Sequence, residues 1–335
     1  MDFFDNHKNL FGAAFLLFLI LTVFVALIPA VNNDKNNAPL PGQQALSDDA
    51  MAGKAIFVAN GCVACHTQQV RNVDMDKKWG KRPSIAADYA VNKRTDLWRN
   101  TATLMGTERT GPDLTAVGTR QPSKEWNLVH LFNPRIVVKE SIMPAYSWLF
   151  ETKKEPSKQD VVVSVPAQYL DQEGSVVATK EALQLVAYLQ SLVQTELPDG
   201  VAGRFLYKKE VKNNPESSNA DNDAGLDGSA LYATHCQACH QQNGEGLKGA
   251  FPPLKGSPVV LNENPELMLT IIMNGYDARE EFGVMPAVGK NAGLKPEEIA
   301  AIMNHERTSW GNSARKVSVS EVKKLMEAIQ QLPNQ

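Results

Sequence analysis

The stretch ANGCVACHTQQVR at residues 59–71 holds two cysteines separated by two residues, with a histidine directly after the second cysteine. A second copy of this pattern, ATHCQACHQQNGEG, stands at residues 233–246. Together the two copies contain all 4 cysteines of the 335-residue chain. A small disulfide-bonded protein distributes its cysteines over a shorter chain, so the pattern indicates another use of the thiols.

A Cys-x-x-Cys-His run is typical of covalent haem attachment. The two thiols add to the vinyl groups of the porphyrin, and the next residue then lies beneath the iron, where its imidazole binds axially. The sequence therefore predicts two covalently bound c-type haems. The predicted attachment residues are Cys62, Cys65, Cys236 and Cys239, and the predicted axial ligands are His66 and His240.

The resemblance between the two halves extends beyond the motifs. GKAIFVANGCVACH (53–66) parallels GSALYATHCQACH (228–240). Two further pairs of tripeptides follow in the same order and at similar spacing: Pro112-Asp113-Leu114 with Pro252-Pro253-Leu254, and Met143-Pro144-Ala145 with Met285-Pro286-Ala287. No other Met-Pro pair occurs among the 10 methionines. The chain therefore contains an internal duplication of one domain.

The duplicated methionines are the predicted sixth ligands of the irons. A thioether is a soft ligand, and His/Met ligation raises the haem potential, which favours electron transfer. The proline after Met143 and Met285 keeps the loop that carries each sulfur out of a helix. Met105 and Met273 are the alternative ligands. With a histidine and a methionine on the two axial positions of each iron, neither iron is open to a substrate.

Further residues near the motifs have weaker predicted roles. Gly111, Pro112, Pro253 and Leu254 are expected to pack against the haems, with an ordinary turn as the alternative. Arg71, Arg109 and Trp98 are candidates for the haem propionates, with plain surface placement as the alternative. His130, His235 and His305 have no spacing that marks them as ligands and are interpreted as structural.

The N-terminus predicts a membrane anchor. LFGAAFLLFLILTVFVALIPAV, residues 10–31, carries no charge and is long enough as a helix to span a hydrocarbon layer of roughly 30 Å. A cleaved signal peptide is the alternative, but its apolar core is usually about 7–15 residues and a small-x-small cleavage site is missing. The flanking charges are too few to orient the span. The net charge of -3 gives no support to nucleic-acid binding.

The predicted fold class is mainly α, with two class I cytochrome c-like helical domains after one transmembrane helix. Helices are expected from residue 47, near 123–132, around 182–193 and from 296, and a hairpin insert is expected at 160–180. The predicted organisation is a tail at 1–9, the transmembrane helix at 10–31, a linker at 32–46, the first haem domain at 47–195, a flexible linker at 196–226 and the second haem domain at 227–335.

Cys-x-x-Cys pairs also occur in zinc sites and in redox proteins. A four-cysteine zinc site leaves the trailing histidines, the Met-Pro loops and the duplication unexplained. A thioredoxin-like redox pair requires a strand–helix pattern around the motif, and neither copy shows one.

The first segment resembles a known family. GCVACHTQQVR, ERTGPDLTAVGTR, HLFNPRIVVKESIMPAYSWLF and LVAYLQSL, after one apolar span, are similar to the membrane-anchored monohaem subunit II of cbb3-type cytochrome c oxidases over about residues 8–195. The resemblance implies that Met143 is the axial ligand. It also implies that the haem domain lies outside the cytoplasmic membrane of a bacterium, with the N-terminus in the cytoplasm and the haems on the periplasmic side.

The second segment, residues 227–335, resembles class I cytochrome c domains appended to oxidases and quinoprotein dehydrogenases. The similarity lies in FPPLKGS, GVMPA, LKPEEIAAIM and SWGN. It implies Met285 as the distal ligand. The chain departs from the subunit II pattern in carrying this second domain and in the long stretch between His66 and Pro112.

The expected function is that of a dihaem electron-input subunit, not an enzyme on its own. Electrons would enter at the second haem, pass to the first and leave to a multi-span haem-copper oxidase catalytic subunit, with further oxidase subunits as partners. The donor would be a soluble cytochrome or a quinol-oxidising complex. Three alternatives stay open: the cytochrome subunit of a nitric oxide reductase, a freestanding membrane-bound shuttle, and a dihaem peroxidase, which requires an open iron.

Overall fold

The computed structural model describes residues 6–36, 38–92, 104–106, 108–170, 172–198, 205, 226–279 and 281–331. The chain divides into two compact units. The first comprises residues 1–51, 60–115 and 194–209, and the second comprises residues 52–59, 116–193 and 210–335. The described residues are mainly helical, as predicted, with one small sheet.

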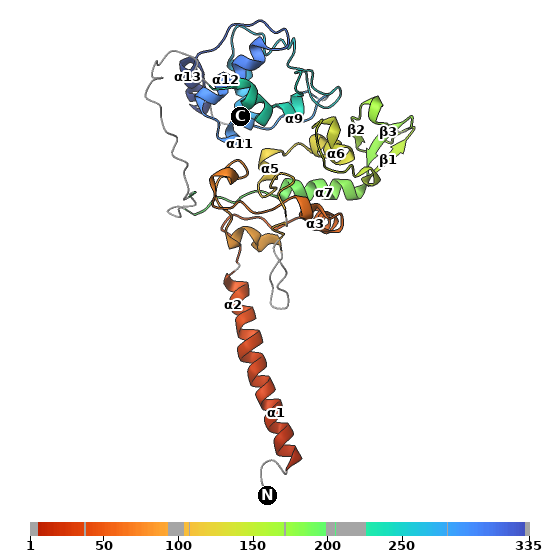
Figure 1. Ribbon diagram of the computed structural model, residues 1–335, viewed down its shortest axis with the longest axis vertical. Helices are drawn as coiled ribbons and strands as arrows, with labels where there is room; N and C mark the ends of the chain where they lie inside the picture. The colour runs from red at the N-terminus through yellow and green to blue at the C-terminus, as the bar shows by residue number, and fades with distance from the viewer. Residues whose placement is uncertain are drawn as a thin grey trace. The chain divides into compact units, whose positions relative to one another are not determined.

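A single N-terminal helix covers the predicted membrane span (Figure 1). It consists of α1 (His7–Leu21), the π-helical turn η2 (Thr22–Leu27) and α2 (Ile28–Asn36). Asn6 caps its start, because its side-chain oxygen accepts a hydrogen bond from the main-chain nitrogen of Lys8 at 3.2 Å. The large apolar side chains of the span are exposed. The helix is long and apolar enough to cross a membrane.

The first unit continues in short helical turns around the first motif. These are α4 (Cys62–Cys65), η3 (Asp74–Asp76) and η4 (Ala86–Asn92). Gly61, directly before α4, has a φ of 68°, which glycine adopts without steric cost. A buried ion pair joins Arg82 Nη2 to Asp88 Oδ1 at 2.5 Å, and the same nitrogen donates to the carbonyl of Thr195 at 2.8 Å. These bonds connect the segment after the first motif to the chain at Thr195.

The helices predicted from residue 47, near 123–132 and around 182–193 are present as α3 (Asp48–Ala59), α6 (Lys124–Phe132) and α7 (Lys180–Ser191). Three further short elements, α5 (Val117–Arg120), η5 (Pro134–Ile136) and η6 (Ser147–Leu149), are not part of the prediction. Ser47 and Ser123 cap α3 and α6 as N-terminal acceptors, each at 3.2 Å. Helix α3 packs closely on α7, since a Cβ at Gly53 would lie 1.9 Å from the carbonyl oxygen of Gln184.

The hairpin insert is confirmed and belongs to a three-stranded antiparallel sheet. Its strands are β1 (Phe150–Lys153), β2 (Val162–Val163) and β3 (Ser175–Ala178), with η7 (Ala167–Tyr169) between β2 and β3. The strand order is β1-β3-β2, with Phe150 opposite Ala178 and Val162 opposite Val177. The predicted hairpin corresponds to β2 and β3. Strand β1, which pairs with the other edge of β3, is not part of the prediction.

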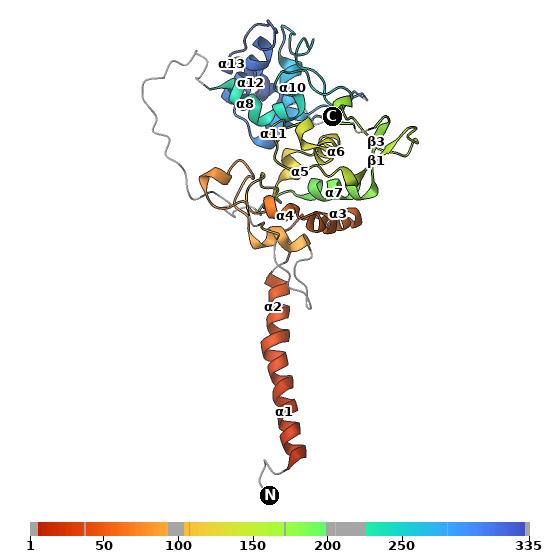
Figure 2. The ribbon, with the colours of Figure 1, turned by 45° about the vertical axis from the view of Figure 1, so that its right-hand side comes forward.

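The C-terminal part of the second unit is a small helical bundle. It contains α8 (Gly228–His235), α9 (Gln237–His240), α10 (Glu266–Asn274), α11 (Val288–Ala292), α12 (Pro296–Thr308) and α13 (Val319–Gln331). Helix α8 lies against α12 (Figure 2), because a Cβ at Gly228 would lie 2.2 Å from the carbonyl oxygen of Ala301. Leu269, Ile299 and Val322 are fully buried in the core that these helices share.

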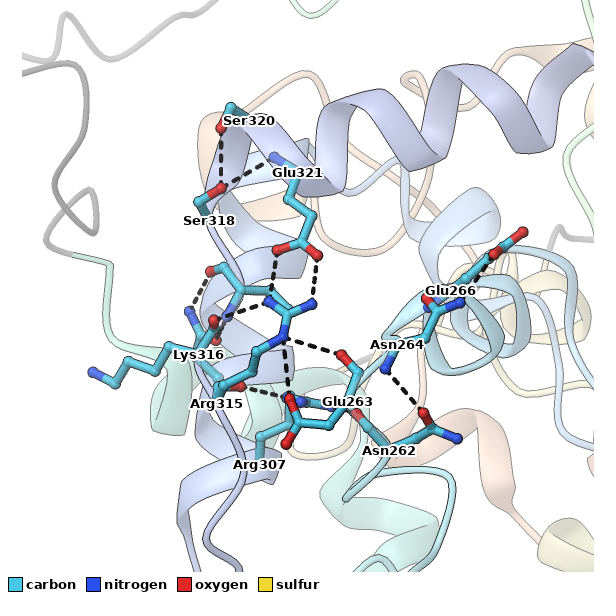
Figure 3. Close-up of polar contacts among 12 residues, drawn as sticks. Asn262, Glu263, Asn264, Glu266, Arg307, Arg315, Lys316, Ser318, Ser320 and Glu321 are labelled. Carbon is cyan, nitrogen blue, oxygen red and sulfur yellow. Dashed lines mark hydrogen bonds and ion pairs between the residues drawn. The ribbon is translucent and has the colours of Figure 1, made fainter.

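A buried arginine holds this bundle together (Figure 3). The Arg307 guanidinium donates to three main-chain carbonyls: those of Val260 and Asn262 at 2.8 Å and that of Arg315 at 2.7 Å. Arg315 in turn forms an ion pair with Glu321, near the start of α13, at 2.7 Å. Because the buried Arg307 is met by several acceptors, it connects the end of α12 to the loop before α10 and to α13.

Parts of the predicted organisation lie outside the described residues. Of the predicted linker 196–226, the structure describes residues 196–198, 205 and 226, and of the predicted tail it describes residues 6–9. Trp98, a candidate for a propionate contact, also lies outside the described residues. The predicted domain boundaries therefore stay predictions.

Candidate haem sites

The second Cys-x-x-Cys-His motif forms a single helical turn, α9. The main-chain nitrogens of Cys239 and His240 donate to the carbonyl of Cys236 at 3.1 and 3.0 Å. All three side chains line one cavity. Both thiols thus reach the same space, as attachment of one porphyrin through two vinyl groups requires.

The imidazole of His240 is oriented for metal binding. Its Nδ1 lies 3.0 Å from the carbonyl oxygen of Pro252, and a carbonyl only accepts, so Nδ1 carries the proton. Nε2 is then the nitrogen with a free lone pair. His240 is 6 % exposed, and burial lowers its pKa, although the bond to Pro252 acts in the opposite direction. The ring is therefore neutral at physiological pH, which is the form that ligates iron.

The Met-Pro loop of the second copy reaches the same cavity. Met285 and Tyr276 exchange two main-chain hydrogen bonds of 2.9 Å each, which fixes the loop. Gly275 has a φ of 78°, and a Cβ there would lie 2.6 Å from the carbonyl oxygen of Met285. Met285 and His240 both line the cavity, so the structure brings together the two predicted ligands of the second iron.

The lining of this cavity fits a haem. It borders about 1410 Å³ of empty space, a figure that includes open solvent. Pro253 and Leu254, predicted to pack on the haem, lie in its wall. The remaining apolar lining includes Phe251, Val259, Leu267, Ile271 and Ile302. Two thiols, an oriented imidazole, a thioether and apolar walls together suit one covalently attached porphyrin.

Several charged or polar residues that line the cavity are not among the predicted site residues. Glu306 of α12 is 5 % exposed, and burial raises the pKa of its carboxyl to about 8, although a hydrogen bond with Cys236 lowers it. His235, interpreted as structural, also lines the cavity. Arg120 and Gln121, from the chain far upstream of the motif, line it as well. No sequence pattern connects these positions to the second motif.

The first motif has the same internal geometry in the first unit. The main-chain nitrogen of His66 donates to the carbonyl of Cys62 at 2.9 Å, and His66 Nδ1 donates to the carbonyl of Pro112 at 2.8 Å. Burial lowers the pKa of His66, against the opposing effects of Pro112 and Asp113. The ring is therefore neutral with Nε2 available, as in the second copy. Pro112, predicted to pack on the haem, thus positions the imidazole through its carbonyl.

Gly111 is matched to the imidazole of His66. A Cβ at Gly111 would lie 2.4 Å from His66 Cε1, so only glycine lets the ring lie against the backbone there. The main-chain nitrogen of Gly111 also donates to the carbonyl of Cys65 at 3.0 Å. The turn at 109–114 is therefore packed directly on the motif.

Asp113 fastens this turn to the chain after the motif. Its carboxylate accepts from the hydroxyl of Thr67 at 2.5 Å and from the main-chain nitrogens of Gln69 at 2.8 Å and Thr115 at 2.9 Å. Asp113 is 1 % exposed. Because these donors satisfy its charge, burial of the carboxylate is tolerated.

The two arginines proposed for propionates share one carboxylate. Arg71 Nε lies 3.1 Å and Arg109 Nη1 2.6 Å from the carboxylate oxygens of Asp76, which is 1 % exposed. Burial alone would raise the pKa of Asp76, but the hydrogen bonds from Arg71 and Arg109 outweigh it and lower the pKa. The guanidinium groups thus brace the loop after the first motif, and a propionate contact stays a prediction for both.

Met143 lies in the second unit, whereas Cys62, Cys65 and His66 lie in the first. It is half-buried in the loop between η5 and η6, and its main-chain nitrogen donates to the hydroxyl of Ser141 at 3.3 Å. Its role as the sixth ligand of the first iron stays a prediction. Met105, the second candidate for that position, is 43 % exposed in the first unit.

Among the described residues, no group of three or more His, Cys, Asp or Glu side chains is arranged to hold a metal ion. Met273, the second candidate ligand of the second iron, places its sulfur 2.6 Å from a Cβ built at Gly289, so it packs between α10 and α11. His130 stacks on Trp126, with ring centroids 4.5 Å apart.

Comparison with known families agrees with this geometry. Residues 2–175 match the family described as cytochrome c oxidase, mono-heme subunit/FixO. The chain belongs to this FixO family. Residues 223–305 match a second family, described as cytochrome c oxidase, cbb3-type, subunit III. The two matches cover the two copies of the haem motif.

Curated relatives share parts of the chain. A cytochrome c-552 of Thermus thermophilus is 41 % identical over 117 residues, covering 30 % of this chain and 76 % of the relative. The cytochrome c subunit of a quinone alcohol dehydrogenase of Gluconacetobacter polyoxogenes is 34 % identical over 165 residues, covering 46 % of this chain but only 34 % of the relative. The cbb3-type oxidase subunit FixP of Bradyrhizobium is 31 % identical over 93 residues, covering 27 % of this chain and 31 % of the relative.

The two matched families are both described as subunits of cytochrome c oxidases. Cytochrome c families imply covalently bound c-type haem. The apolar N-terminal helix of the chain and its family indicate membrane anchoring.

Proposed function

We propose that this chain is the dihaem electron-input subunit of a cbb3-type haem-copper oxidase. The residues proposed to hold the first haem are Cys62, Cys65, His66 and Met143, and those for the second are Cys236, Cys239, His240 and Met285. When bound, each haem supplies an iron that takes up and releases a single electron. The protein's part is to attach the group, orient its ligands and exclude water.

The hydrogen bond from each motif histidine to a proline carbonyl is the observation that supports the proposal most directly. His66 donates to Pro112 at 2.8 Å and His240 to Pro252 at 3.0 Å. Each bond fixes the tautomer that leaves Nε2 for iron. Two motifs with the same preorganised imidazole are expected of two sites with the same ligation.

The proposed order of transfer begins at the second site, continues to the first and ends at a multi-span catalytic subunit. We further propose that the donor is a soluble cytochrome or a quinol-oxidising complex. The chain would cross the bacterial cytoplasmic membrane once, with the N-terminus in the cytoplasm and both haem modules on the periplasmic side, where c-type haem is attached.

Isolation of the tagged chain from native membranes tests this function. We expect a multi-span partner that shows a b-type haem in a reduced-minus-oxidised spectrum, together with oxygen consumption by the purified complex. Recovery of the chain alone would favour a freestanding shuttle. A partner that consumes nitric oxide and no oxygen would favour the cytochrome subunit of a nitric oxide reductase.

A further inference from the structure

A segment upstream of the second haem motif contacts that motif. Residues 119–126, here called the wall segment, connect α5 to α6 and lie in the second unit with the second motif. The indole nitrogen of Trp126 donates to the carbonyl of Ala238 at 3.0 Å. Ala238 stands between the two attachment cysteines, so this bond ends on the attachment turn itself.

Further contacts hold the wall segment in place. The Asn291 side-chain nitrogen donates to the carbonyl of Thr119 at 3.2 Å. A Cβ at Gly283 would lie 2.9 Å from Glu125 Oε2, which shows how closely the segment approaches the loop before Met285. The stacking of Trp126 on His130, with ring planes 13° apart, fixes the direction of the indole. The contact is thus spread over both ends of the segment.

Two side chains of the wall segment enter the haem cavity. Arg120 and Gln121 line the same space as Cys239, His240 and Met285. The Gln121 amide nitrogen lies 3.8 Å from Cys239 Sγ, the sulfur that is expected to form a thioether. The cavity is also lined by three charged residues that follow the second motif in the sequence: Asp277, Arg279 and Glu306.

We propose that the wall segment completes the second haem site, with Arg120 as the residue that raises the potential of the second haem and Trp126 as the anchor that keeps the segment against the attachment turn. A positive charge beside a haem favours the reduced iron, because reduction removes one unit of positive charge. Without the wall segment, the second haem site lacks part of its wall. This inference rests on the proposed binding of a second haem.

The test is a redox titration of the full chain and of four variants. Arg120→Gln removes the charge and is expected to lower the potential of the second haem, while Arg120→Lys keeps the charge and is expected to restore most of it. Arg135→Gln, which alters an exposed arginine of η5 outside the cavity, serves as the matched control. Met285→Ala identifies which of the two titrating components belongs to the second haem.

Trp126→Phe tests the anchor. It removes the indole N–H and keeps an aromatic ring. The equilibrium constant for contact between the wall segment and the attachment turn is therefore expected to fall about fivefold, the contribution of one hydrogen bond. The measurement is the rate of electron exchange between the haems after flash reduction. Trp310→Phe, which removes a similar 3.0 Å bond to Gln242 within the second module, is the control.

Distinct outcomes separate this inference from the proposed function. If Arg120→Gln and Arg135→Gln titrate identically, or if Arg120→Lys lowers the potential as far as Arg120→Gln, the role of Arg120 is refuted while two bound haems keep the function intact. An exchange rate unaffected by Trp126→Phe refutes the anchor. Absence of a second haem in the unaltered chain refutes the proposed function itself.

Discussion

The two haem motifs share one chemistry in two different settings. In both, a single helical turn carries the cysteines and a proline carbonyl orients the histidine. The second set of residues lies within one unit and around one cavity. Cys62, Cys65 and His66 lie in the first unit, and Met143 stays a predicted ligand. His240 is buried and His66 half-buried. The two copies thus share the attachment turn and differ in what surrounds it.

This difference has a consequence for the two potentials. Burial, hydrogen bonds and nearby charges set the potential of a haem with fixed ligands. The second cavity contains a buried carboxyl, Glu306, and the arginine of the wall segment, Arg120. The first motif is instead followed by a cluster of ion pairs, in which Asp76 meets Arg71 and Arg109, and Asp113 also lies near Arg109. Two haems with identical ligands are therefore expected to titrate separately.

The largest expected effect is loss of one haem. Cys236→Ser with Cys239→Ser is expected to abolish attachment at the second site and to leave the first, because each pair serves its own turn. The matched change is Cys62→Ser with Cys65→Ser. Haem staining on a denaturing gel should fall by about half in either double variant. Staining that stays complete in one of them would remove that motif from the attachment sites.

Replacing the methionines sharpens the comparison of the axial ligands. Met285→Ala is expected to lower the potential of the second haem, and Met143→Ala that of the first, by a sizeable fraction of the roughly 0.8 V range that axial ligands control. Redox titration of each variant measures this. If Met143→Ala leaves both potentials unchanged, the first iron takes its sixth ligand elsewhere, with Met105 as the next candidate.

Gly111→Ala tests the packing that is particular to the first motif. The added methyl would lie 2.4 Å from the His66 ring, so the ring or the turn must shift, at a cost of about 1–3 kcal/mol in the free energy of unfolding. Thermal unfolding followed at the haem absorbance measures the loss. Pro112→Ala, which keeps the carbonyl that His66 uses, is the control and should be milder. Equal stability of Gly111→Ala and the unaltered chain would contradict this packing.

The smallest effect concerns Glu306. Its pKa is raised to about 8 by burial, so it is protonated at neutral pH and ionises as the pH rises. The negative charge then favours ferric iron, and the potential of the second haem should fall through this range by at most about 59 mV per pH unit. Glu306→Gln should remove the slope, and the exposed Glu327→Gln should retain it. A slope that persists in Glu306→Gln assigns it to another group.

Local patterns predict much of the fold. The helices expected from residue 47, near 123–132, around 182–193 and from 296 all form, as α3, α6, α7 and α12, because capping and apolar periodicity act within a few residues. The hairpin of β2 and β3 is equally local. Strand β1 was missed, because its pairing with β3 depends on tertiary packing rather than on its own short sequence.

In the candidate sites, too, the local patterns are predictable and the contacts between distant parts of the chain are not. The motif turns and the Met-Pro loops are short patterns, and the structure places His240 and Met285 on one cavity. Arg120 and Gln121 reach that cavity from far upstream, and no periodicity connects them to it. Arg71 and Arg109 were expected to face propionates, but no sequence pattern indicates that Asp76 engages both. Such contacts follow from the folded chain alone.

The central claim is that one polypeptide holds two covalently attached haems. Intact mass spectrometry of the purified, denatured chain tests it most directly, with a spectrum of the alkaline pyridine adduct to count haem per protein. We expect a mass increased by two haems and a ratio of two. A mass increased by one haem or none, or a ratio of one, would contradict the claim.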